Sequence, residues 1–208
     1  MKQAVRAGRP KSREKREAIL RASVELFLKH GVKETSMDEV ARLSGVSKQT
    51  IYSHYKNKDS LFLAVIAFKC EEHMISLDEL SDHQGGLEST LSHIGRKFLA
   101  LFQDEEVIAM YSIIIAEARN SPRVAELFYE AGPLASLHSV AGIIHKLSDK
   151  SLSMESARLL AMDFYSFLKG SWHMRSLMNL DFRLNETARQ KHVDAVVAKT
   201  MCLLHHHY

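Results

Sequence analysis

The segment from Ser36 to Tyr55 constrains the fold more than any other part of the sequence. Ser36 and Glu39 have the spacing of a capping box, in which a serine and a glutamate three positions later close the start of a helix. Gly45 suits the end of that helix, and Ser47 is placed to cap a second one. Two short helices joined by a glycine turn predict a helix-turn-helix motif.

The remainder of the chain is predicted to be helical. Proline occurs three times and glycine nine times in 208 residues, which disfavours a turn-rich β architecture. Apolar residues recur every three or four positions from Glu14 onward, and no segment shows the sustained alternation of a strand. We therefore expect an all-α protein with a kink at Gly132-Pro133. Beyond the motif, helices are predicted over 14–30, 58–80, 87–103, 105–119, 123–150, 154–178 and 186–204.

Positive charge is concentrated near the N-terminus. Residues 1–60 hold fourteen Lys and Arg against seven Asp and Glu, whereas residues 61–208 hold fourteen against eighteen. This asymmetry favours a polyanionic partner over a merely solvated basic surface. We expect a disordered basic arm over 1–13, which adds phosphate attraction or reaches a minor groove. A helix-turn-helix DNA-binding domain over 14–60 and a larger helical domain over 61–208 are expected to follow.

The second short helix of the motif is predicted to read DNA. Val46 and Ile51 anchor it, and its other face is polar, as expected for a helix that enters the major groove. Gln49 suits adenine, Lys48 suits guanine, and the methyl group of Thr50 suits thymine. A solvated face is the alternative, and Tyr55 is equally open to interpretation as a core residue. The predicted DNA-contacting residues are Thr35, Ser36, Ser47, Lys48, Gln49, Thr50, Tyr52, His54, Tyr55, Lys56 and Lys58.

These motifs resemble a known family. The stretch from Glu14 to Leu61 is similar to the DNA-binding domain of the TetR/AcrR family of transcriptional regulators. The family often has glycine where Gln49 stands and phenylalanine where Tyr55 stands. The resemblance implies a homodimeric repressor that a small molecule releases from its DNA operator. The matching residues are Ile19, Leu20, Ala22, Phe27, Gly31, the segments 35–37 and 45–52, Val40, Ala41 and the segment 55–61.

The larger domain resembles the regulatory domain of the AefR-like branch of this family, through the segments 117–122, 128–133, 167–170 and 173–175. Its aromatic residues are core residues by default, but an effector cavity between helices would be lined by such residues and a few polar ones. Such a cavity suits a hydrophobic effector. A DNA-binding regulator or activator without a cavity is the alternative. The predicted effector-contacting residues are His73, Phe98, Phe102, Tyr111, Ile115, Phe128 and Phe164.

The last two predicted helices are the expected dimer interface. Residues 186–204 carry a narrow apolar stripe and residues 159–178 are broadly apolar, so that two copies would meet in a four-helix interface, which the resemblance also implies. In the alternative, both helices cover the core of a monomer. The predicted interface residues are Leu168, Trp172, Val193, Val196, Val197 and Met201.

Other functions have less support in the sequence. Apart from His205–His207, no histidines are three or four positions apart, and Cys70 and Cys202 are distant, so we expect no metal site. A metal-dependent helical sensor or enzyme is a third interpretation, and a thiol sensor at Cys70 competes with a buried, inert cysteine. Catalytic motifs are absent, so we expect neither an enzyme nor a cofactor. The longest apolar run, 61–68, is too short to span a bilayer and there is no signal peptide, which predicts a cytoplasmic protein.

Overall fold

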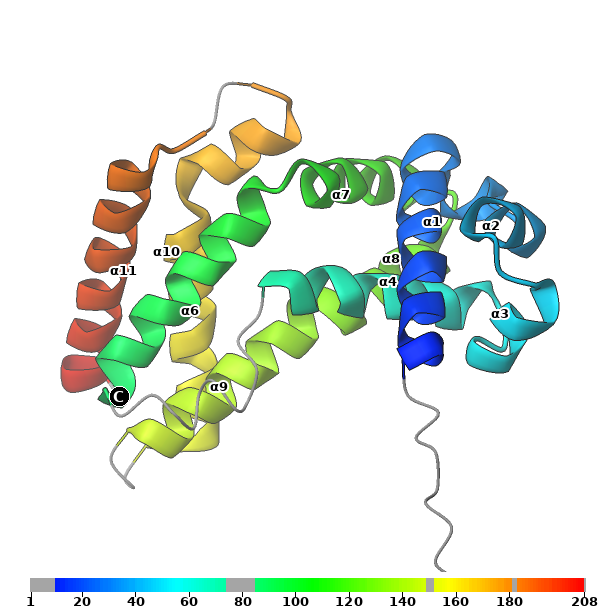
Figure 1. Cartoon of the computed structure of the whole chain (residues 1–208). Helices are drawn as coiled ribbons and strands as arrows, with labels where there is room; N and C mark the ends of the chain where they lie inside the picture. Colours follow the sequence, from blue (N-terminus) through cyan, green and yellow to red (C-terminus); the bar gives the residue numbers. More distant parts are fainter. Residues whose placement is uncertain (1–9, 74–84, 149–151, 181–182, 208) are drawn as a thin grey trace, which may run out of the picture.

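Every regular element in the described part of the chain is a helix, which confirms the all-α prediction. The computed structural model describes residues 10–73, 85–148, 152–180 and 183–207. Figure 1 shows the helices labelled in chain order. They are α1 (Pro10–Glu34), α2 (Met37–Ser44), α3 (Lys48–His54), α4 (Lys58–His73), α6 (Gly86–Gln103), α7 (Glu105–Glu117), α8 (Pro122–Tyr129), the π-helical segment η1 (Glu130–Leu134), α9 (Ala135–Leu147), α10 (Met154–Leu177) and α11 (Glu186–His207).

Local capping signals set several helix boundaries. The Asn57 side chain accepts a hydrogen bond from the backbone N–H of Ser60 at 2.9 Å, which begins α4. Asp104 accepts one from the backbone N–H of Val107 at 3.0 Å and begins α7 at the predicted break. Each cap satisfies a backbone donor that the first turn of a helix leaves without a partner.

The N-terminal boundary differs from the prediction. Helix α1 begins at Pro10, four residues before the expected start at Glu14, so residues 10–13 are not part of an extended arm. Proline is favoured in the first turn because the backbone N–H that it lacks has no helical partner there. Residues 1–9 of the predicted arm and residues 74–80 of the predicted helix 58–80 lie outside the described residues.

The kink expected at Gly132-Pro133 is the π-helical segment η1, which contains Pro133 and joins α8 to α9. A π-helical turn is a usual place for a proline because the wider turn accommodates the missing hydrogen bond. A second kink interrupts α10 at Gly170, where the backbone leaves helical geometry. The sequence prediction missed this second kink, although the glycine itself was its signal.

Two apolar cores organise the molecule. The N-terminal core joins α1, α2, α3 and the first half of α4, and it also includes Met110 and Ile114 of α7 and Leu127 of α8. The C-terminal core is formed mainly by α6, α9, α10 and α11. In Figure 1 the two groups lie at opposite ends, with α4 and α7 between them. The predicted division at residue 60 therefore falls inside the first turn of α4, whose Leu61 and Phe62 are fully buried in the N-terminal core.

The predicted dimer residues lie inside a single chain. Leu168 and Val193 have no exposed surface, and Met201 packs against the same C-terminal core. The interface prediction is therefore wrong for the buried members of the set, because the apolar stripe of α11 faces α6 and α10 of its own chain. The buried members are Leu168, Trp172, Val193, Val196 and Val197.

A substitution at Gly31 tests the close approach between the end of α1 and the end of α7. The φ of Gly31, +78°, is left-handed, and a Cβ there would lie 2.3 Å from Glu117 Oε1 of α7. Gly31→Ala is expected to lower the free energy of unfolding by about 1–2 kcal/mol, because the backbone is strained and the Glu117 side chain must move aside. Urea unfolding followed by circular dichroism measures the change.

Gly142→Ala is the matched control. Gly142 lies within α9 and a Cβ there meets nothing within 4 Å. Alanine is the better helix former, so this variant is expected to gain about 0.5–1 kcal/mol. A Gly31→Ala variant as stable as the wild-type protein would contradict the strained geometry at the end of α1.

Candidate nucleic-acid interface and internal cavity

The helix-turn-helix has the local geometry that its sequence predicts. The Ser36 hydroxyl accepts a hydrogen bond from the backbone N–H of Glu39 at 3.2 Å, and the Glu39 carboxylate accepts one from the backbone N–H of Ser36 at 2.9 Å. The hydrogen bonds that the Glu39 carboxylate accepts from the backbone N–H and from the hydroxyl of Ser36 lower the pKa of Glu39. Gly45 follows α2 with a left-handed φ of 65°. Ser47 then caps α3, and its hydroxyl accepts from the backbone N–H of Thr50 at 3.2 Å.

Helix α3 presents a polar face to solvent because its apolar residues point the other way. Ile51 is fully buried and Val46 is 8% exposed, and both belong to the N-terminal core. Tyr52 is an exception to the usual burial of aromatic rings, with 45% of its surface exposed. An exposed tyrosine among hydrogen-bonding side chains is suited to contact phosphates or base edges. The exposed residues on and next to α3 are Ser47, Lys48, Gln49, Tyr52, Ser53, His54 and Lys56.

One ion pair joins the two short helices. Lys48 Nζ lies 2.6 Å from Asp38 Oδ1 of α2, and this contact raises the pKa of Lys48. Both side chains are more than half exposed, so solvent screens the pair and its contribution to stability is small. Lys48 can therefore exchange this partner for a phosphate or a guanine at little cost.

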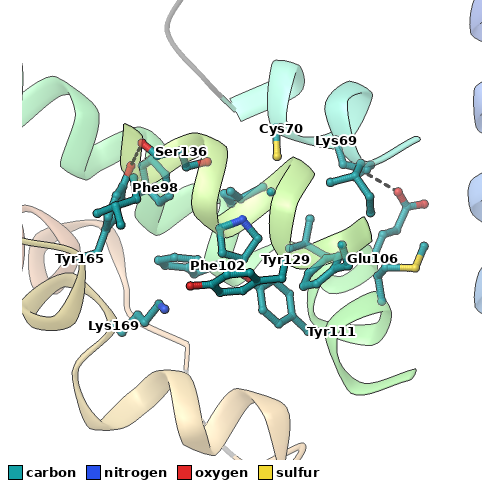
Figure 2. Close-up of a pocket in the computed structure, with 18 of the residues that line it drawn as sticks. Lys69, Cys70, Phe98, Phe102, Glu106, Tyr111, Tyr129, Ser136, Tyr165 and Lys169 are labelled. Atoms are coloured by element: carbon teal, nitrogen blue, oxygen red, sulfur yellow. Dashed lines mark hydrogen bonds and ion pairs between the residues drawn. The ribbon is translucent and has the colours of Figure 1, made fainter. Parts of the chain in front are cut away.

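A cavity of about 240 Å³ separates this motif from the C-terminal core. Its walls come from α1, α4, α6, α7, α8, η1, α9 and α10. Aromatic rings dominate them, and Tyr111 packs edge-to-face on Phe128 with ring centroids 4.7 Å apart. Figure 2 shows Phe102 near the centre, with side chains from several helices around it. The aromatic lining residues are Phe98, Phe102, Tyr111, Phe128, Tyr129 and Tyr165.

The charged residues on opposite walls of the cavity differ in their surroundings. Lys69 of α4 is 13% exposed, and its Nζ lies 2.9 Å from Glu106 Oε2 and 3.7 Å from Asp104 Oδ2 (Figure 2). Lys169 of α10 lies instead over the ring of Phe102, with Nζ 5.9 Å from the centroid. Burial lowers the pKa of Lys169. The cavity therefore holds one lysine with carboxylate neighbours and one without.

His173, one turn after Lys169, lies among rings. Its imidazole centroid is 5.0 Å from that of Phe102 and 5.8 Å from that of Tyr111. Its Nδ1 is buried and has no hydrogen-bond partner among the described residues. Burial, followed by the positive charge of Lys169, lowers the pKa of His173 to about 4. The imidazole is therefore neutral at physiological pH.

Two family models match this chain and together cover most of it. Residues 19–65 match the model described as bacterial regulatory proteins of the TetR family. Residues 89–203, more than half of the chain, match the C-terminal domain of AefR-like transcriptional repressors. The chain belongs to the TetR family of transcription regulators, in its AefR-like branch. This membership confirms the resemblance found in the sequence and makes the protein a DNA-binding regulator rather than an enzyme.

Several relatives support this assignment. The repressor BepR of Brucella suis is 30% identical over 113 residues, which are 53% of this chain and 54% of BepR. The match to the curated relatives thus spans about half of their length or less. A TetR-family regulator from Mesorhizobium loti superposes with a TM-score of 0.72 and 27% identity over 93% of this chain and 98% of that one. The flavonoid-responsive regulator FrrA superposes with a TM-score of 0.66 and 28% identity over 90% and 95%.

Two of the predicted DNA-contacting side chains are buried, and the ammonium group of a third has backbone partners. The Thr35 hydroxyl is buried and donates to the backbone oxygen of Gly31 at 2.8 Å. Tyr55 is 7% exposed within the N-terminal core, so its interpretation as a core residue holds. Lys58 donates to the backbone oxygens of Lys33 and Thr35, so its ammonium group stabilises the end of α1. Thr35 directly precedes the motif, and Tyr55 and Lys58 follow α3, but this proximity in the sequence did not reveal their inward contacts.

Some of the predicted effector-contacting residues line the cavity and others do not. Phe98, Phe102, Tyr111 and Phe128 line the cavity. Phe164 is fully buried in the C-terminal core, and Ile115 is 58% exposed on the surface, so both assignments are wrong. His73 is the last residue of α4, and its side chain lies outside what the structure describes.

The sequence analysis missed the aromatic lining residues Tyr129 and Tyr165 and the two lysines, Lys69 and Lys169. Helical periodicity places lysines on solvated faces, and only the three-dimensional packing brings these two to a cavity wall. In the described part of the chain, no three His, Cys, Asp or Glu side chains gather as metal ligands would. No helix there is long and apolar enough to cross a membrane.

Cys70 lines the cavity, and burial raises its pKa to about 11, whereas Cys202 is exposed on α11. Only the thiolate is nucleophilic, so at pH 8 Cys70 is expected to react with Ellman's reagent at least about tenfold more slowly than Cys202. The comparison uses Cys202→Ser, which retains only Cys70, and Cys70→Ser, which retains only Cys202. Equal rates would restore the thiol-sensor interpretation.

The lowered pKa of His173 predicts a dependence of stability on pH. The unfolded chain binds a proton near pH 6.5 and the folded chain only near pH 4, so this residue removes stability as the pH falls between these values and has no such effect above them. His173→Phe keeps an aromatic ring and cannot be protonated. Allowing for solvent screening, the wild-type protein is expected to lose about 1 kcal/mol more than this variant between pH 7 and pH 4.5.

Urea unfolding at each pH measures this difference. Exposed His138 of α9 provides the control variant His138→Gln, which is expected to follow the wild-type curve. Parallel curves for the wild-type protein and His173→Phe would contradict the buried, neutral state of the imidazole.

Proposed function

We propose that this protein is a homodimeric repressor that leaves a pseudo-palindromic operator when a small hydrophobic effector fills the cavity. The observation that carries the proposal is the position of α4. Its first turns, with Leu61 and Phe62, pack in the core that holds the recognition helix α3. Later along the same helix, Ile66, Lys69 and Cys70 line the cavity. A molecule that displaces one end of α4 therefore acts directly on the other.

The effector must distinguish between two states of the protein. An effector that bound equally well to the DNA-binding and released states would shift nothing, so it has to favour the state whose α3 helices fit the operator poorly. The match to a repressor domain and the similarity to BepR support repression. FrrA, a flavonoid-responsive regulator of 28% identity, supports a ligand-responsive mechanism.

A regulator or activator without a cavity is the competing hypothesis. It predicts a continuous apolar core between α4 and α10. The aromatic-lined space at that place favours the ligand-responsive hypothesis, because large side chains such as Phe102 and Tyr111 surround it without filling it. Ligand pockets of about 300–1,000 Å³ with mostly apolar walls are usual in proteins, and this cavity lies just below that range.

We propose that the dimer forms through the outer faces of α10 and α11, in place of the buried residues that the sequence suggested. Large apolar side chains are exposed along α10 and directly after it, which is unusual for a surface that stays in water. A two-fold axis there would hold two α3 helices in successive major grooves about 34–36 Å apart or further on a longer operator. These exposed side chains are Met154, Leu159, Met174, Met178 and Leu180.

Selection of DNA duplexes from a random pool tests this function. At about physiological salt, where phosphate attraction does not mask base recognition, the protein is expected to recover a two-fold-symmetric site. Gln49→Ala should then lower affinity for that site by about tenfold or more while leaving unrelated duplexes unaffected, because a glutamine–base contact contributes about 1–3 kcal/mol of discrimination.

Lys56→Ala is the matched contrast, since Lys56 is exposed beside α3 and suited to phosphate. It is expected to weaken binding to all duplexes and to reduce the slope of log K against log salt by about one. Recovery of generic DNA alone would overturn the operator proposal. Equal losses on all duplexes for Gln49→Ala would remove Gln49 from base recognition.

A further inference from the structure

Lys169 gives the cavity an electrostatic preference. In the described part of the chain no Asp or Glu forms an ion pair with it, and its half-buried ammonium lies over Phe102. Figure 2 shows this lysine on the α10 side, with its nitrogen pointing toward the aromatic side chains. A charge withdrawn from water without an opposite charge is unfavourable, and an anion that enters the cavity would offset that cost.

The other lysine of the cavity and two of its hydroxyl groups are already engaged. Lys69, on the wall opposite Lys169, forms ion pairs with Glu106 and Asp104. The Tyr165 hydroxyl donates to the backbone oxygen of Ser136 at 3.1 Å, and the Ser166 hydroxyl donates to that of Met162 at 2.8 Å. Lys169 is therefore the charged donor that remains for a ligand.

Aromatic walls alone would favour a cation, because the faces of the rings carry negative potential. Lys169 already occupies that position over Phe102, and a second cation would be repelled by it. The carboxylate among the described lining residues, that of Glu106, is paired with Lys69. A cationic effector therefore finds neither a free ring face beside Lys169 nor an unpaired acid, whereas an anion finds an unpaired ammonium group.

We propose that the cavity binds a compact aromatic carboxylate, whose oxygen pairs with Lys169 Nζ while its ring packs among the aromatic side chains of α6, α7 and α8. This inference rests on the proposed function, in which the cavity is the effector site. The cavity of about 240 Å³ limits the ligand to a small ring system. A ligand bound in this way would bridge α10 and the opposite wall of the cavity, where Lys69 and Cys70 of α4 lie.

Three probes of one shape and different charge test the proposal with the full chain. They are 2-naphthoate, neutral 2-naphthamide and cationic 2-naphthylmethylamine, and isothermal titration calorimetry at pH 7.5 measures their affinities. We expect naphthoate to bind about tenfold to a hundredfold more tightly than naphthamide, as a charge-assisted hydrogen bond does, and the amine to bind most weakly. Higher salt should reduce this preference.

Lys169→Met keeps the aliphatic stem and removes the charge. It is expected to lower the affinity for naphthoate to that for naphthamide and to leave the latter within about threefold, because the aromatic contacts remain. Lys199→Met is the matched control, since Lys199 Nζ also lies over a ring, 5.7 Å from the centroid of Phe167, but does not line the cavity. Lys169→Arg retains the charge and is expected to retain the preference, and the circular dichroism of each variant checks its folding.

The outcomes separate this inference from the proposed function. Equal binding of naphthoate and naphthamide, or an unchanged preference in Lys169→Met, overturns the assignment of an anion while the neutral probe still demonstrates an effector cavity. Failure of all three probes to bind overturns both the inference and the cavity as an effector site. The selection of an operator is independent of either result.

Discussion

Helix α4 belongs to two environments at once, and the rest of the structure depends on this. Leu61, Phe62 and Val65 have no exposed surface and pack in the core of the helix-turn-helix, whereas Lys69 and Cys70 face the cavity. A single helix therefore connects the surface proposed to contact DNA with the cavity proposed to bind an effector. Packed interiors resist continuous deformation, so a ligand that moves one end of such a helix shifts the molecule between discrete arrangements.

A second connection runs through α7. Met110 and Ile114 reach the N-terminal core, and Glu117 at the end of the same helix contacts the turn at Gly31. Near its start, Glu106 and the capping residue Asp104 hold Lys69 of α4. Helix α7 thus touches both the end of α1 and the cavity wall of α4. The DNA-binding part is consequently held by two helices, and a change in the cavity acts on both of them.

Sequence reasoning predicted the elements whose causes are local. The capping box at Ser36, the turn at Gly45 and the cap at Asn57 rest on contacts a few residues apart, and each is present. Most of the errors concern residues whose packing partners are distant in the chain. Tyr55 and Lys58 follow α3 in the sequence but turn toward the N-terminal core or the end of α1, and the apolar stripe of α11 packs within its own chain. Periodicity shows that an apolar stripe is buried, but it does not show whether the same chain or a second copy covers it.

The cavity illustrates why functional residues escape such reasoning. Four of its six aromatic members were predicted, because large rings at helical spacing are expected inside a helical domain, whereas Tyr129 and Tyr165 were missed. Lys169 was not predicted either, since a lysine on an otherwise mixed helix is normally solvated. Among the described residues this lysine lies over Phe102 and has no carboxylate partner, and neighbouring His173 is kept neutral by its buried surroundings. A residue that departs from the ordinary rules of burial in this way is best explained by the ligand that would complete its environment.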